Sequence, residues 1–127
     1  MGRIEDKIQK AVIKWSQQAG VRKAFPCLKL LYHIPNERYC DPIQGKQLKL
    51  MGVKSGVPDL CLPVPNKGYH GLYIELKAEN GKVSDNQDWW LIELHQQGYM
   101  CAVCFGLEQA INTILFYLEG WGNAHKK

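Results

Sequence analysis

The segment from residue 58 to residue 77 constrains the fold most, because it predicts two strands joined by a tight turn. In residues 59–64, and again in residues 72–77, every second position is apolar. This alternation is typical of a strand that packs one face against a core. Residues 65–68, with the sequence Pro-Asn-Lys-Gly, are rich in turn-forming types. We therefore expect an antiparallel hairpin of two half-buried strands.

Charged residues gather at the open end of this predicted hairpin. Asp59 begins the first strand, while Glu75 and Lys77 end the second. The alternation places all three side chains on the face away from the core. Two carboxylates and a lysine at one sheet end can hold a divalent metal ion and position a water, which suits phosphodiester hydrolysis. The alternative is a surface hairpin whose charges are only solvated.

An ordered set of motifs extends this pattern over residues 4–118. The motifs are His33-Ile34-Pro35-Asn36-Glu37, Met51-Gly52, Gly56-Val57-Pro58-Asp59, Gly71-Leu72-Tyr73-Ile74-Glu75-Leu76-Lys77, Ser84-Asp85-Asn86-Gln87 and Gly98-Tyr99. The set resembles the virus-type replication-repair nuclease (VRR-NUC) domain of the PD-(D/E)XK nuclease superfamily. The resemblance implies a metal-dependent DNA endonuclease. For stand-alone members, which are mostly viral, it implies an activity like that of Holliday-junction resolvases in phage DNA replication, repair or recombination.

The resemblance also assigns roles at the hairpin end. It implies that Asp59, Glu75 and the backbone carbonyl of Leu76 bind Mg²⁺ or Mn²⁺. Hard oxygen ligands suit such ions. Lys77 would orient the attacking water or neutralise charge in the transition state, and the sequence leaves both roles open. Whether one ion or two are bound also stays open.

Three further candidates each have a functional and a structural interpretation. Glu5 matches a first-helix glutamate that often points into the site in this superfamily, but an acid there also suits the helix dipole. Gln87 either completes a capping box with Ser84 or reaches toward Lys77 and the scissile phosphate, and we expect these roles to compete for one amide. Asn36 matches a family asparagine with a DNA-binding role; the alternative is that it only forms the turn after Pro35.

The charge of the chain permits nucleic-acid binding without proving it. The net charge is +4 and the pI is about 8.8. Lys46, Lys49 and Lys54 precede the Pro58-Asp59 pair. A phosphate backbone requires cations near acidic metal ligands, so we expect these lysines to contact DNA. The alternative is a solvated basic face.

Length and composition exclude several classes of protein. With 127 residues, 46% hydrophobic and 22% charged, the sequence predicts one globular domain over residues 1–127. No apolar run approaches the 18 residues of a membrane span, and the N-terminus lacks the apolar segment of a secretory signal. An odd count of five cysteines without an export signal favours reduced thiols in a cytoplasm, that of the host if the chain is phage-encoded.

The remaining segments predict an α/β fold with a mixed sheet flanked by helices, as in restriction endonucleases. Ile4, Ile8, Val12, Trp15 and Ala19 recur at helical spacing, and Gly20 would end that helix. The other expected elements are a strand at Leu28–Ile34, a short helix at Gln44–Met51, a helix at Asp85–Gln97, a strand at Tyr99–Phe105 and a helix at Leu107–Glu119.

A homodimer is expected, because resolving a four-way junction needs two symmetric incisions. Trp89, Trp90, Phe116, Tyr117 and Trp121 offer aromatic surface for an interface. Three alternatives stay open: a monomeric flap or nicking nuclease, a non-catalytic DNA-binding module with the same fold, and a sequence-specific restriction-type nuclease. The short chain leaves little room for the recognition elements that the last would need.

Overall fold

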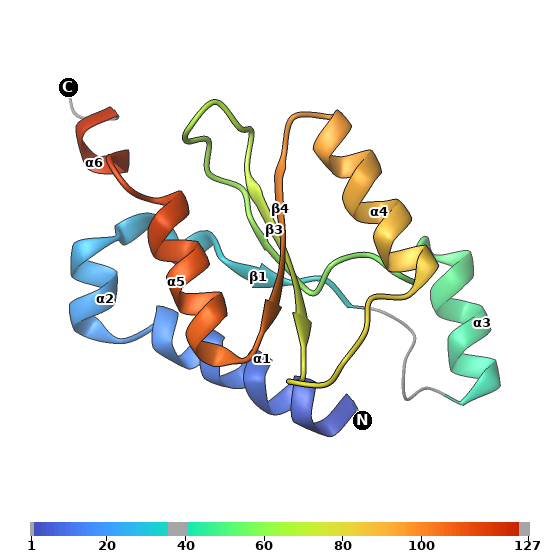
Figure 1. The fold of residues 1–127 in the computed structure, drawn as a ribbon. Helices are drawn as coiled ribbons and strands as arrows, with labels where there is room; N and C mark the ends of the chain where they lie inside the picture. Colours follow the sequence, from blue (N-terminus) through green and yellow to red (C-terminus); the bar gives the residue numbers. More distant parts are fainter. Residues whose placement is uncertain (1, 36–40, 125–127) are drawn as a thin grey trace.

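Helices cover both faces of a mixed sheet in the computed structural model, which describes residues 2–35 and 41–124 (Figure 1). Within those residues the sheet has four strands in the order β1-β2-β3-β4. The first two pairings are antiparallel and β3 runs parallel to β4. The strands are β1 (Tyr32–His33), β2 (Leu60–Leu62), β3 (Leu72–Lys77) and β4 (Met100–Phe105). The helices are α1 (Gly2–Ser16), α2 (Ala19–Ala24), the 3₁₀ helix η1 (Pro26–Leu30), α3 (Pro42–Leu50), α4 (Asp85–Gln96), α5 (Leu107–Tyr117) and α6 (Trp121–Ala124).

The main core lies between the sheet and the pair α1 and α5, on the opposite side of the sheet from α4 (Figure 1). Leu72, Ile74 and Leu76 alternate along β3 and are at most 1% exposed. Val12 from α1 and Ile114 from α5 pack against them. No helix in the described part of the chain is long and apolar enough to cross a membrane.

The predicted hairpin is confirmed. Leu60 pairs with Ile74 and Leu62 with Leu72. The turn passes through Lys67 at φ 54° and Gly68 at φ 84°, conformations that favour the glycine. The expectation of half-buried strands was wrong, because both faces of the hairpin are covered. Every residue of β2 is buried, and Tyr73 alone in β3 is partly exposed.

The first helix ends earlier than the sequence predicted. Gln17 and Gln18 donate backbone hydrogen bonds to the carbonyls three residues earlier, which closes α1 at Ser16. Gly20 lies inside the short helix α2 rather than at a helix end. Apolar spacing therefore predicted the buried face but missed the tight turn between two helices.

The strand expected at Leu28–Ile34 was also largely wrong. Pro26 begins the 3₁₀ helix η1, in the first-turn position where a proline needs no N–H partner. Only Tyr32 and His33 pair with β2. A short apolar run cannot distinguish a strand from a helical turn by periodicity alone.

The other predicted elements agree with the structure within two residues. Asp41 caps α3 by accepting the N–H of Gln44 at 2.8 Å, so this helix begins two residues earlier than expected. Gly52 follows α3 at φ 102°. The helices α4 and α5 and the strand β4 occupy the predicted segments.

Candidate active site

Asp59 lies at the end of β2 and is held by hydrogen bonds of both its side chain and its backbone. Its Oδ2 atom accepts the N–H of Leu76 at 2.7 Å. Its carbonyl accepts the N–H of Ile34 and lies 2.8 Å from Nδ1 of His33. The residue is 2% exposed. A carboxylate in this setting has a fixed orientation at the open end of the hairpin.

Pro58 explains why the carbonyl of Leu76 is available at this end. Leu60 pairs with Ile74, so the register extended by two residues sets Pro58 opposite Leu76. In an antiparallel ladder such a pair exchanges both backbone bonds, but proline has no N–H to donate. The N–H and C=O of one strand residue point to the same edge, so the Leu76 carbonyl faces the side that holds Asp59.

Glu75 and Lys77 lie on the face of β3 opposite the main core, as the alternation predicted. They are buried, however, with 1% and 6% exposure, so the alternative of a solvated surface hairpin is wrong. The Nζ atom of Lys77 lies 3.8 Å from Oε2 of Glu75. Burial makes this contact stronger than a surface ion pair, because water screens it less.

Gln87 performs both structural roles that its position permits. Its Oε1 atom accepts the N–H of Ser84 at 2.9 Å, and its own N–H binds Oγ of Ser84, which completes the capping box of α4. Its Nε2 atom donates to Oε2 of Glu75 at 3.0 Å. The cap uses only the oxygen of the amide, so the two roles do not compete. The nitrogen contacts Glu75 rather than the expected Lys77, and a contact with the scissile phosphate stays a prediction.

Glu5 reaches the same end of β3 from the first turn of α1. It lines a cavity together with Lys77. The structure thus brings Glu5 to the rim of the site that contains Glu75 and Lys77. Asn36 lies outside the described residues.

The three predicted DNA-binding lysines are exposed on α3 and on the segment that follows it. Lys46 and Lys49 belong to α3, and Lys54 lies four residues before Pro58. The helix that carries Lys46 and Lys49 lies next to α4 (Figure 1).

A cluster on α4 that the sequence analysis did not assign fixes the segment between these lysines and Pro58. Asn86 donates through Nδ2 to the carbonyl and to Oγ of Ser55, at 2.8 and 2.9 Å. Trp90 donates through Nε1 to the same carbonyl at 3.0 Å. Gly56 has φ 86°, and a Cβ there would lie 2.6 Å from Asn86 Nδ2. The motif around Asn86 contained this signal, but its partner is distant in sequence.

The oxygen donors at the hairpin end are of the kind that Mg²⁺ binds. Mg²⁺ is typically bound by one or two carboxylates, retains several water ligands and also binds oxygens of a substrate phosphate. Asp59, Glu75 and the Leu76 carbonyl supply oxygen donors of this kind. In the described part of the chain no group of three or more His, Cys, Asp or Glu residues could hold a metal ion.

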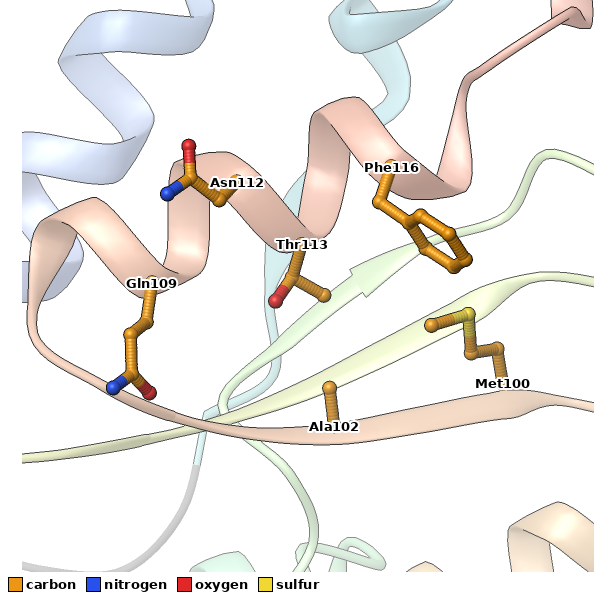
Figure 2. Close-up of a pocket in the computed structure, with 6 residues that line it drawn as sticks. All are labelled: Met100, Ala102, Gln109, Asn112, Thr113 and Phe116. Carbon is orange, nitrogen blue, oxygen red and sulfur yellow. The ribbon is translucent and has the colours of Figure 1, made fainter.

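A pocket on the side of the sheet opposite α4 has no charged residue among the described residues of its lining. This open pocket of about 390 Å³ lies between β4 and α5 (Figure 2). Its polar lining consists of Gln109, Asn112 and Thr113, which are neutral. Met100 and Ala102 supply the strand side of this pocket. The described lining of this pocket therefore supplies no charged group suited to phosphodiester chemistry.

The chain was compared with protein families, curated proteins and solved structures. No curated protein matched it. A solved structure described as a VRR_NUC domain protein is 32% identical, with a TM-score of 0.75, over 91% of this chain and 88% of the other. The model of the VRR-NUC domain family matches residues 3–107. This chain therefore belongs to the VRR-NUC domain family, a group of nucleases of the PD-(D/E)XK type.

Proposed function

We propose that residues 1–127 act as a divalent-metal-dependent DNA endonuclease that hydrolyses phosphodiester bonds. The observation that carries the proposal is the buried set of Asp59, Glu75 and Lys77 at one end of a hairpin in a VRR-NUC chain. A buried set of two carboxylates and an ammonium is costly to retain without a ligand. DNA is the substrate expected of a nuclease domain.

Asp59, Glu75 and the Leu76 carbonyl would hold Mg²⁺ or Mn²⁺. When bound, such an ion polarises a phosphate oxygen and lowers the pKa of a coordinated water. Lys77 places a positive charge beside Glu75, where it stabilises the negative charge that develops on the phosphate. Gln87 holds the Glu75 carboxylate in one orientation through its 3.0 Å hydrogen bond. Glu5, at the rim, would orient a water or help to hold a second ion.

DNA would approach from the side of α3. Lys46, Lys49 and Lys54 would contact its backbone, together with Asn36. The three lysines are exposed, and cations that contact the DNA backbone would offset the repulsion between the carboxylates and the phosphates. We propose branched DNA as the preferred substrate, in phage replication, repair or recombination. The four cysteines that the described residues contain are free thiols, in keeping with action in a reducing cytoplasm.

Cleavage assays on defined DNA structures test the proposal. Purified protein would be incubated with supercoiled, linear, flapped and four-way-junction DNA, in Mg²⁺, Mn²⁺, Ca²⁺ or EDTA. We expect cleavage in Mg²⁺ or Mn²⁺ and none in Ca²⁺, which accepts looser geometry and more ligands. Asp59→Asn, which keeps the side-chain size, is the inactive control. Full activity after exhaustive EDTA treatment would contradict metal dependence, and DNA binding without cleavage in any metal would favour a non-catalytic module.

We further propose that the active species is a homodimer that cuts two strands of a junction. Trp89 and Phe116 are 54% and 51% exposed, so both have apolar area available for an interface. Tyr117 is fully buried and belongs to the core instead. Light scattering at micromolar concentration and mapping of paired nicks on an immobile junction test this. A monomeric mass together with nicks on one strand only would contradict the proposal of a dimeric resolvase, while the proposal of a nuclease would stand.

A further inference from the structure

A cavity of about 550 Å³ adjoins the candidate active site at the end of β3. Residues 77–82 form one wall of the cavity, and Ile4 and Glu5 of α1 line it as well. Lys77 thus belongs both to the active site and to this cavity. The volume falls within the range of roughly 300–1,000 Å³ that is usual for ligand sites.

The charges in the cavity select the class of ligand. Two cationic residues, Lys77 and Lys82, and two anionic residues, Glu5 and Glu79, line it. The formal charges cancel, so the cavity is poorly suited to a small dianion such as inorganic phosphate. Ile4, which is 56% exposed, adds an apolar surface. One phosphodiester charge attached to a neutral sugar and base matches this combination better.

The loop that carries Lys82 is fixed against Lys77. Gly81 donates its N–H to the carbonyl of Ala78 at 2.8 Å, which closes a tight turn after β3. A Cβ at Gly81 would lie 3.3 Å from both Cβ and Cδ of Lys77. The loop backbone at Gly81 therefore packs against the Lys77 side chain, one residue before Lys82.

We propose that this cavity binds the nucleotide next to the scissile phosphodiester, and that Lys82 contacts the phosphate of that nucleotide. The inference rests on the proposed nuclease function, because a DNA strand that places one phosphate at Lys77 must continue past it. The cavity is lined by Lys77 and by a second cationic residue, Lys82.

Binding measurements with modified DNA test the proposal without requiring cleavage. Fluorescence anisotropy would measure DNA binding in EDTA and in Ca²⁺. Each DNA in the series would carry one neutral methylphosphonate in place of a phosphate. The position of the methylphosphonate would change by one phosphate from one DNA to the next, on both sides of the mapped or presumed cut site. We expect Lys82→Ala to weaken binding of unmodified DNA about fivefold. The slope of log Kd against log salt should fall by about one. Lys82→Arg, which keeps the charge, should bind like the wild type, as should the control Lys23→Ala on α2.

One methylphosphonate position should weaken the wild type by the same factor and leave Lys82→Ala unaffected. Two results would show that the cavity is not a nucleotide subsite: Lys82→Ala binds DNA like the wild type, or its loss of affinity adds to the loss caused by the methylphosphonate at every position. Cleavage by the wild type would still support the nuclease proposal in either case. If the coupling is present but no metal supports cleavage, the subsite stands and the nuclease proposal fails. A wild-type protein that binds no DNA would overturn both.

Discussion

The Nε2 atom of Gln87 donates a hydrogen bond to Oε2 of Glu75 at 3.0 Å, while the Oε1 atom of the same amide caps α4. One side chain therefore ties the first turn of a helix to a carboxylate at the end of β3. Such contacts orient the groups that bind metals, and their loss typically costs about 10–100-fold in affinity or activity.

The two halves of this amide can be tested separately. Gln87→Glu keeps an oxygen for the capping box, since glutamate serves there as well as glutamine. It also sets a carboxylate against the buried Oε2 of Glu75, so we expect a lower melting temperature and, below the melting range, cleavage lowered about 10–100-fold. The reciprocal variant Ser84→Ala should lose about 0.5–2 kcal/mol of stability and keep its cleavage rate below the melting range. If Gln87→Glu cleaves DNA as fast as the wild type, Gln87 has no role in the active site.

The ligand and transition-state roles should separate in a second set of variants. We expect Asp59→Ala and Glu75→Ala to lose metal binding and cleavage together. Lys77→Ala should keep most of its metal affinity, because a protonated amine cannot coordinate a cation, while cleavage falls roughly 10²–10³-fold. Calorimetric titration with Mn²⁺ and single-turnover cleavage supply the two measurements. Loss of metal in Lys77→Ala as severe as in Asp59→Ala would contradict this division.

The sequence predicted the parts of the site that depend on local patterns. Alternation placed Glu75 and Lys77 on one face of a strand, and the turn residues brought Asp59 to the same end. The spacing of Ser84 and Gln87 predicted the capping box. Each of these features is decided within a few residues, so a single sequence contains them.

Features that depend on distant segments were not predictable in this way. Alternation identifies the face toward the main core, but it does not reveal that α4 packs over Glu75 on the other face. The contact between Asn86 and Ser55 joins residues 31 positions apart. The cavity next to Lys77 combines a loop with α1, so Lys82 gave no signal in the sequence beyond an exposed charge.

The thiol of Cys101 should contribute to the alkaline loss of stability. Burial raises the pKa of this thiol from 9.0 to about 11 in the folded protein. Its contribution to stability is therefore complete below pH 9 and is lost as the pH rises toward 11, because only the unfolded chain releases the proton in that window. Cys101→Ser removes the titrating group. Urea unfolding under reducing conditions should show a smaller decline between pH 9 and 11 for this variant, and equal slopes would contradict the assignment.

Gly81 should act as a positioning residue for Lys77. In Gly81→Ala the new Cβ would lie 3.1 Å from the Ala78 carbonyl and 3.3 Å from Cβ and Cδ of Lys77, so the lysine must shift. A displacement of 1 Å at a catalytic group can cost about 10²-fold, and we expect kcat to fall roughly tenfold for a shift of a few tenths of an ångström. The Kd for DNA should change less, because Lys82 is exposed and its flexible side chain can readjust.

A double-mutant cycle distinguishes this role from a general loss of stability. If Gly81 acts through Lys77, Gly81→Ala should add no further loss of cleavage to Lys77→Ala, since the displaced group is already absent. The matched control is Gly20→Ala on α2, where nothing lies within 4 Å of the new Cβ. That variant should cleave normally and gain about 0.5–1 kcal/mol of stability, because alanine restricts the unfolded chain more than glycine. Additive losses of Gly81→Ala and Lys77→Ala would show that the loop affects cleavage by a route independent of Lys77.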